Sequence, residues 1–105
     1  MPERRSSERK KVLLEARWSS ISRRHEARVD DVSLGGCFVN TYGHAELNEP
    51  IDLEILMPSG DWLALQGVVA TYHAGVGFGM SFTALSEQQT ASLKELLDTA
   101  AEHAA

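Results

Sequence analysis

The N-terminal stretch RRSSERKK, residues 4–11, places five basic residues in eight positions. Within it, Arg5 and Arg9 form an RxxxR pair, and Arg4 directly precedes that pair. A guanidinium group presents its donors as a planar fork that can hold a phosphate or the O6/N7 edge of guanine, and its flat face can stack on a base. The stretch is also compatible with a solvated basic tail, so its chemistry depends on what the remaining sequence supplies.

A second motif lies in the segment DDVSLGG, residues 30–36, with the spacing Asp31-x-Ser33-x-x-Gly36. The Asp31 carboxylate can accept hydrogen bonds from the ring N–H and the exocyclic amine of a guanine. The Ser33 hydroxyl can both donate and accept, and Gly36, which lacks a Cβ, allows positive φ and close approach of the backbone to a ligand. Together with the arginine forks, these groups predict a guanine nucleotide site. The bland alternative is a tight turn in which Gly35 and Gly36 bend the chain and the Ser33 hydroxyl stabilises it.

Charge is segregated along the chain, whose net charge is −5. Residues 1–28 hold nine basic and four acidic residues, whereas residues 29–105 hold one basic and eleven acidic residues. This asymmetry predicts a cationic face for an anionic partner.

Composition limits the remaining classes of function. A chain of 105 residues suits a single domain, and Cys37 is its only cysteine, so no intramolecular disulfide and no paired CxxC zinc site can form. The four histidines show no ligand spacing and no nucleophile, base and acid stand together, so we expect no metal, no cofactor and no enzymatic activity. The polar start and the lack of an apolar run of ~20 residues predict neither a secretory signal nor a membrane span, and we expect a cytoplasmic protein.

The elements that must position the two motifs are short strands. Alternation of apolar and polar residues, with turn signals at regular spacing, predicts an all-β domain: a small antiparallel barrel of about six strands, followed by a C-terminal helix. The predicted strands cover residues 12–18, 24–32, 37–41, 51–57, 62–73 and 78–82.

The helix is predicted over residues 86–104, where the apolar period changes. Ser86 and Gln89 have the spacing of a capping box, and a leucine stripe at helical spacing follows them. The whole chain is thus expected to be one domain, with a flexible basic arm at 1–11, a barrel at 12–84 and the helix packed on the barrel.

Several side chains are expected to be buried. These are Cys37, Phe38, Phe78, Met80 and Phe82. Trp18 and Trp62 are expected in the core or at the barrel rim, and Gly67 is expected to mark a bulge or bend in its strand. Simple alternation along residues 24–32 places Asp31 on the same side as Val29.

The two motifs, in this order and at this separation, resemble those of the PilZ family, bacterial receptors for cyclic di-GMP. The likeness extends over nearly the whole chain, through ERRSSERKKVLLEARW, VDDVSLGGCFV and GVGFGMSFTAL. The resemblance implies a six-stranded antiparallel, Greek-key-like β-barrel with a helix at its end. It also implies that cyclic di-GMP binds on the outer surface of the barrel while the arginine arm wraps over it.

Roles for individual residues follow from the resemblance. Arg5 and Arg9 would contact phosphate and guanine. Asp31, Ser33 and Gly36 would hold a guanine from the barrel side. An arginine in the position of Arg4 is often linked in this family to a stacked dimer of cyclic di-GMP, which implies two ligand molecules per protein. Gly35 and Tyr72 are further candidate contacts, Tyr72 as a stacking face.

The function expected on this basis is that of a receptor or adaptor. Ligand binding would order the arm and change the surface shown to a separate downstream protein, in motility, biofilm or surface-attachment control. Two other classes remain open. One is a nucleic-acid-binding barrel with a basic arm, against which the acidic remainder of the chain counts. The other is a PilZ-like protein adaptor that binds no nucleotide, against which the intact motifs count.

Overall fold

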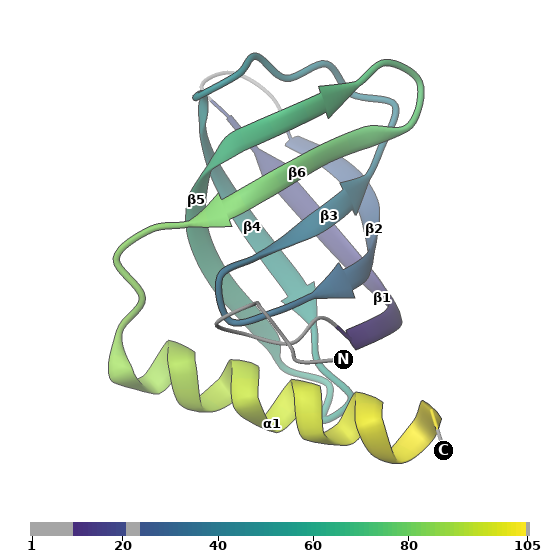
Figure 1. The fold of residues 1–105 in the computed structure, drawn as a ribbon, viewed down its shortest axis with the longest axis vertical. Helices are drawn as coiled ribbons and strands as arrows, with labels where there is room; N and C mark the ends of the chain where they lie inside the picture. The colour runs from purple at the N-terminus through teal and green to yellow at the C-terminus, as the bar shows by residue number, and fades with distance from the viewer. Residues whose placement is uncertain (1–9, 21–23, 105) are drawn as a thin grey trace, which may run out of the picture.

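The protein is a six-stranded barrel closed at one end by a helix (Figure 1). The computed structural model describes residues 10–20 and 24–104, with side chains described for 14–20 and 24–98. The elements are β1 (Lys10–Ser19), β2 (Arg24–Val32), β3 (Gly36–Asn40), β4 (Pro50–Leu56), β5 (Trp62–His73), β6 (Gly77–Phe82) and α1 (Glu87–Ala104).

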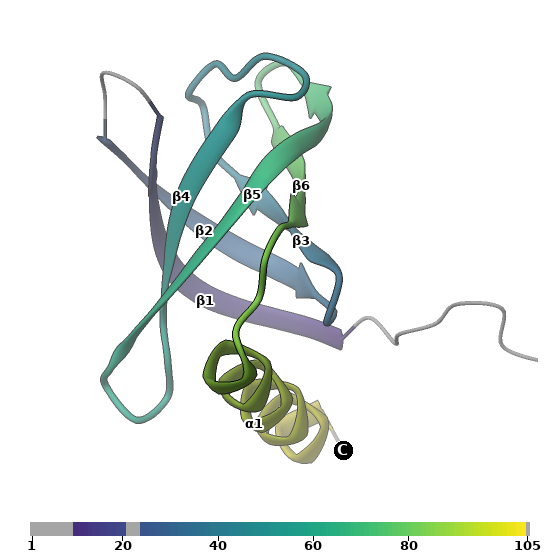
Figure 2. The same cartoon turned by 90° about the vertical axis from the view of Figure 1, so that its left-hand side faces the viewer.

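All strand pairs of the barrel are antiparallel, and their order around it is β1-β2-β3-β6-β5-β4. The last strand in this order, β4, pairs back with β1, so the sheet has no open edge. Figure 2 shows α1 lying across one end of the barrel, where it contacts β1 and β5. The predicted fold, a six-stranded antiparallel barrel with a C-terminal helix, is confirmed.

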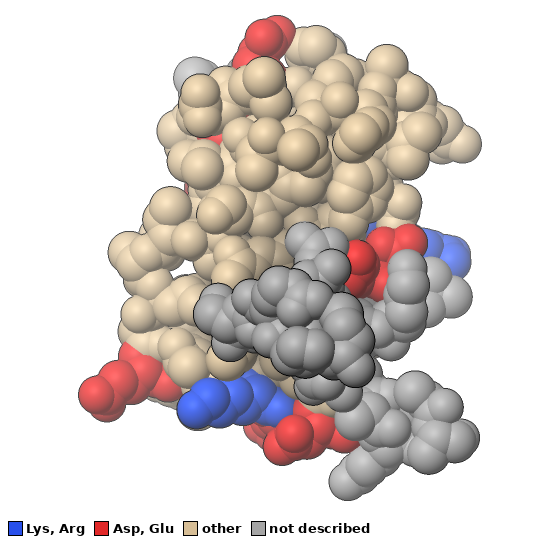
Figure 3. Space-filling model, viewed as in Figure 1, with Lys and Arg blue, Asp and Glu red and all other residues tan. Residues whose placement is uncertain are grey.

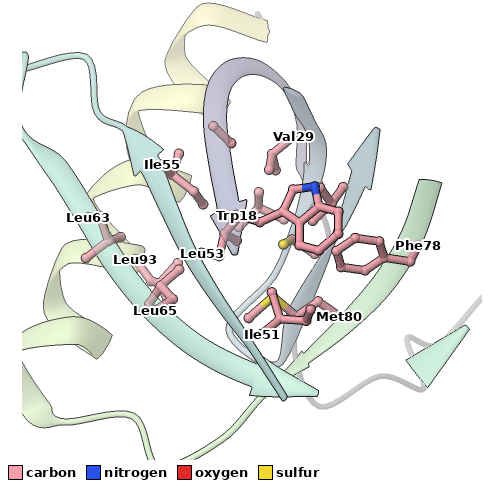
Figure 4. Close-up of a cluster of buried hydrophobic side chains, with 14 of the residues drawn as sticks. Trp18, Val29, Ile51, Leu53, Ile55, Leu63, Leu65, Phe78, Met80 and Leu93 are labelled. Carbon is pink, nitrogen blue, oxygen red and sulfur yellow. The ribbon is translucent and has the colours of Figure 1, made fainter. Parts of the chain in front are cut away.

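The inward-facing side chains fill the barrel and form a single hydrophobic core (Figure 4). Trp18 is fully buried and meets the Phe78 ring edge-on, with the ring centroids 5.0 Å apart. Leu93 and Leu96 of α1 are also fully buried, so the helix completes the core at its end of the barrel. Because side chains occupy the interior, a ligand of nucleotide size must bind outside the barrel.

The capping box predicted at the start of the helix is present. The Ser86 N–H donates to Gln89 Oε1 at 2.8 Å, and the Gln89 N–H donates to Ser86 Oγ at 3.0 Å. The Gln89 side-chain amide also donates to the Ala64 carbonyl on β5 at 2.8 Å. One residue therefore both begins the helix and ties it to the barrel.

Three expectations about burial and strand irregularity need comment. Phe38 and Phe82 are not buried as predicted but half-buried. Cys37 and Val39, the neighbours of Phe38, take the inward positions of β3, and Phe82 packs against the core from the end of β6. Gly67 pairs regularly on both sides, so the predicted bulge there is wrong; the extra residue of β5 is Ala70. Of the two tryptophans, Trp18 is in the core, whereas Trp62 lies at the start of β5 and is 39% exposed.

Candidate functional site

A β-bulge in β2 turns Asp31 toward the outside of the barrel. Val29 of β2 pairs with Val39 of β3, and Asp31 pairs with Phe38, which directly precedes Val39 in the chain. Two steps along β2 thus match one step along β3, so Asp30 has no partner in this ladder. The extra residue reverses the alternation, because Val29 and Val32 both point inward while Asp31 points outward. The expectation that Asp31 shares a face with Val29 is therefore wrong. The bulge puts this carboxylate on the outer surface, where a ligand could reach it.

The turn between β2 and β3 is built around the Ser33 hydroxyl. Ser33 Oγ accepts from the Gly35 N–H at 3.1 Å and from the Gly36 N–H at 3.3 Å, while the Ser33 N–H donates to the Gly36 carbonyl at 2.9 Å. Ser33 is only 6% exposed. Its hydroxyl thus shapes the turn beside Asp31, as the bland interpretation of the motif predicted.

The two glycines of this turn differ in what surrounds them. A Cβ on Gly36 would overlap the carbonyl oxygen of Met80 on β6, so this position needs glycine for strand packing. Gly36 is not among the glycines with positive φ, so the conformational freedom that glycine permits is not used there. A Cβ on Gly35 would meet only Ser33 Oγ, at 3.9 Å. Gly35 is exposed, and its missing side chain leaves the backbone open to an approaching group.

A row of outward-facing residues continues from Asp31 across the barrel. Asp31 pairs with Phe38, Phe38 with Gly79, and Gly79 with Thr71. The Gly79 N–H donates to Thr71 Oγ1 at 3.2 Å, and the Phe38 ring lies 5.9 Å from the ring of His73. The result is an uncharged strip with two rings beside the carboxylate. Sequence reasoning missed this strip, because the register depends on the bulges at Asp30 and Ala70.

Tyr72 lies on the opposite side of β5 from that strip. It pairs with the buried Phe78, and its ring meets the ring of His44 in the β3–β4 loop at 5.0 Å. The structure does not bring Tyr72 to the surface that carries Asp31. The neighbouring residues Thr71 and His73 face that surface instead.

The arginines Arg4, Arg5 and Arg9 lie outside the described residues. The backbone that follows them is described, however: Lys10 pairs with Val32 and Lys11 pairs with Asp31. The described chain therefore begins beside the DxSxxG motif, one residue after Arg9 in the sequence.

Other kinds of site find little support in the part of the chain that the structure describes. No three His, Cys, Asp or Glu side chains among those described, at residues 14–20 and 24–98, are grouped so as to hold a metal ion. Among residues 10–20 and 24–104, no helix is both long enough and apolar enough to cross a membrane.

The chain folds into a small antiparallel barrel, with the β2–β3 turn at one end of it. The PilZ domain family model matches residues 3–99, and the chain belongs to that family. PilZ domains are receptor and adaptor domains rather than enzymes. No curated protein matches the sequence.

Solved structures with the same fold have little sequence in common with this chain. The PilZ domain of YcgR from Escherichia coli, solved with c-di-GMP, is 13% identical, with a TM-score of 0.81 over 97% of this chain and 95% of that one. The PilZ domain of CeSA from a cellulose-synthesizing bacterium is 21% identical, with a TM-score of 0.73 over 88% and 96%. The Bacillus subtilis inhibitor of motility, MotI/DgrA, is 14% identical, with a TM-score of 0.79; 97% of this chain matches 52% of it. The chain thus spans about half the length of that protein.

Proposed function

We propose that this protein is a receptor for cyclic di-GMP. The observation that carries the proposal is the register at the start of β1, where Lys10 and Lys11 pair with Val32 and Asp31. This pairing joins the arginine segment to the barrel beside the DxSxxG turn. Two motifs that are weak signals separately thereby converge on one end of the molecule. The E. coli YcgR PilZ domain, solved with c-di-GMP, supports the choice of ligand.

The chemistry of the two motifs suits the two halves of this ligand. Asp31 accepts hydrogen bonds from the donor edge of one guanine, and the exposed backbone at Gly35 lets the base approach closely. Arg5 and Arg9 hold phosphate and guanine as planar forks. Ser33 and Gly36 contribute mainly by fixing the turn, since the first is buried in its hydrogen bonds and the second is packed on β6.

Arg4 sets the number of ligands in this proposal. Its guanidinium stacks on or pairs with a second cyclic di-GMP, so that two molecules are held together. The neighbouring strip of Phe38 and His73 offers ring faces on which an additional base can stack.

Ligand binding changes the surface presented to a separate downstream protein. The arm at residues 1–11 is neutralised by the phosphates and becomes ordered against the barrel, which creates a new surface. The fold shared with an inhibitor of motility suggests motility or surface attachment as the output, in the cytoplasm of a bacterium. The protein itself catalyses no reaction and needs no metal or cofactor.

Calorimetric titration with cyclic di-GMP tests the proposal, with GTP and single-stranded DNA as control ligands. We expect saturable binding of cyclic di-GMP only. No heat at high micromolar concentration overturns the proposal, and DNA binding with a steep salt dependence would identify a nucleic-acid-binding barrel instead.

Single substitutions test the individual contacts. Arg5→Ala, Arg9→Ala and Asp31→Ala should each weaken binding by about 1–3 kcal/mol, the range for a lost bidentate contact. Arg24→Ala is the matched control, because Arg24 is an exposed arginine whose ion pair is with Glu54 on β4, away from the turn. Equal losses in the three arginine variants, with no loss in Asp31→Ala, would mean that only net charge matters. Arg4→Leu should reduce the stoichiometry from two to one, and unchanged two-to-one binding removes Arg4 from its role.

A further inference from the structure

A hollow of about 890 Å³ lies on the outside of the barrel over β1 and β2. Residues of the loop after β3, the β5–β6 turn and the start of β5 also line it, but none of the residues proposed to bind cyclic di-GMP does. Figure 3 shows acidic and basic side chains together at the right-hand margin of the molecule, beside β2, in contrast to the surface over β6. A volume of this size is in the range of sites that receive a ligand.

The hollow carries more acidic than basic groups. Its charged lining residues are Glu15, Arg17, Glu26, Arg28 and Asp30. Three carboxylates and two guanidinium groups leave an excess of negative charge, which attracts a cation and repels a phosphate. A cationic ligand therefore suits this hollow, whereas a nucleotide does not.

The two arginines of the hollow already lie opposite carboxylates. Arg17 Nε lies 2.5 Å from Glu54 Oε1 on the neighbouring strand. Arg28 pairs with Glu15 in the β1–β2 ladder, which brings their outward side chains together. The excess negative charge therefore lies with the other two carboxylates of the hollow.

Those two carboxylates, Glu26 and Asp30, have no ion-pair partner among the described side chains. An exposed ring lies near the first of them. A Cβ on Gly43 would meet the ring of His25 at 2.9 Å, so the loop after β3 packs against β2 at this level. Tyr42 directly precedes Gly43, lines the hollow and is 92% exposed. A carboxylate without a cation and an exposed aromatic ring thus border the same part of the hollow.

Arg17 shows how this surface holds a guanidinium group. Its Cζ atom lies 3.9 Å from the centroid of the Trp62 ring, while its Nε pairs with Glu54. Such an arrangement combines a cation–π interaction with a charge-assisted hydrogen bond. Tyr42 and Glu26 offer the same two groups, a ring and a carboxylate, and no arginine among the described residues pairs with them.

We propose that the hollow binds an arginine side chain of a separate protein. The guanidinium group lies on the Tyr42 ring and donates to Glu26, and the Asp30 carboxylate adds negative charge beside it. Val76, which is 54% exposed, packs against apolar atoms next to that arginine. A hydrogen bond of 3.1 Å from the Thr41 N–H to the Val76 carbonyl fixes the turn that carries it. Arginine and aromatic residues are enriched at the centre of protein–protein interfaces, as this arrangement requires.

This inference goes beyond cyclic di-GMP binding and does not depend on it. It states which chemistry a partner protein must present to the barrel. The binding of an arginine is measured without cyclic di-GMP, so a failure of one proposal leaves the other intact.

Nuclear magnetic resonance on the isotope-labelled full chain tests the site, with a short peptide as the probe. The peptide acetyl-Gly-Leu-Arg-Leu-Gly-amide should shift the indole N–H signal of Trp62 and the amide signals of Tyr42 and Val76 in a saturable way. The same peptide with citrulline, which has the shape of arginine but no charge, should bind about tenfold more weakly. The absence of these shifts at about 5 mM peptide, or equal binding of the two peptides, overturns the proposal.

Two pairs of substitutions locate the arginine. Glu26→Gln should weaken peptide binding about three- to tenfold because the carboxylate charge is lost, whereas Glu87→Gln, in the first turn of α1, should leave binding unchanged. Tyr42→Leu should weaken binding about threefold, whereas Tyr42→Phe keeps the ring and should bind as the unsubstituted protein does. No difference between the two Gln variants overturns the proposal, and so does no difference between the two Tyr42 variants.

Two other occupants of the hollow are distinguished in the same experiment. The chain's own basic arm fills the hollow if the peptide binds only after Arg4, Arg5 and Arg9 are replaced by Ala. A second copy of the chain fills it if the Trp62 and Tyr42 signals shift with protein concentration in the absence of peptide. Either result overturns the proposal that a separate protein supplies the arginine.

Discussion

Two sides of the barrel differ in the charge of their outward-facing side chains. On the side formed by β1, β2 and β4, two outward arginines share one carboxylate: Arg17 Nε lies 2.5 Å from Glu54 Oε1, and Arg24 Nη2 lies 3.8 Å from the same oxygen. On the side formed by β3, β6 and β5, the three strands contain no Asp, Glu, Lys or Arg, and glycines bring these strands close together. The inward alternation is the same on both sides. Because the outward residues are not needed to form the core, the difference between them indicates that the two sides of the barrel have different functions.

The largest effect should come from adding a methyl group at a glycine where β3 packs closely against β6. Gly36→Ala puts a methyl group against the Met80 carbonyl, which is backbone and cannot rotate away. We expect a loss of about 3 kcal/mol in the free energy of unfolding, measured by urea denaturation.

Gly35→Ala is the control next to it, because a Cβ at Gly35 meets no atom closer than 3.9 Å. It should change stability by less than about 1 kcal/mol while weakening cyclic di-GMP binding, if the ligand approaches the turn at that point. A stable Gly36→Ala variant would show that β3 can move away from β6, contrary to the close packing of this side.

These positions also show what could be predicted from the sequence. The strands and the capping box were predicted correctly because alternation and capping depend only on residues near one another in the chain. The direction of Asp31 and the outward placement of Thr71 and His73 could not be predicted. In both strands one extra residue, Asp30 in β2 and Ala70 in β5, reverses the alternation midway.

Tyr72 shows how an extra residue in a strand misleads a prediction that is based on alternation. Regular alternation from the buried Val69 would put Tyr72 on the outside, but the extra residue at Ala70 turns it inward, opposite Phe78. Bulges have weak sequence signals, so a candidate site that depends on them needs the register. The positions of the motifs could be found from the sequence, but the side of the barrel to which Asp31 points could not.

Removing the Ser33 hydroxyl should have the next largest effect. Ser33→Ala leaves the N–H groups of Gly35 and Gly36 without the oxygen that accepts them. We expect a loss of about 1–2 kcal/mol in the free energy of unfolding, together with weaker cyclic di-GMP binding. Hydrogen exchange at the Gly35 and Gly36 amides provides the local measurement. Unchanged exchange in Ser33→Ala would mean that the turn holds its shape without the hydroxyl.

A smaller effect on stability is expected at the Arg17–Glu54 ion pair. The Arg17 guanidinium lies 3.9 Å from the centroid of the Trp62 ring while it also pairs with Glu54. A double-mutant cycle with Arg17→Met and Trp62→Leu should give a coupling of about 0.5–1 kcal/mol. The same cycle with Arg24→Met in place of Arg17→Met is the control and should give almost none. A coupling that disappears in the first cycle would leave Trp62 as an exposed ring without a structural role.

The smallest effect concerns Glu49, in the β3–β4 loop. The Glu46 N–H donates to Glu49 Oε1 at 2.8 Å, and this hydrogen bond, with a smaller contribution from Ser20, lowers the pKa of Glu49 from its usual value. A lowered pKa in the folded state stabilises the protein above the unfolded pKa, and that contribution is lost as the pH falls through the folded value. Glu49→Gln can still accept the hydrogen bond but lacks the charge. It should therefore cost a few tenths of a kcal/mol at about pH 7 and nothing at about pH 2. Asp61→Asn, which removes an exposed carboxylate from the β4–β5 turn, is the control, and an equal pH-dependent loss in both variants would assign the effect to net charge instead of the Glu46 hydrogen bond.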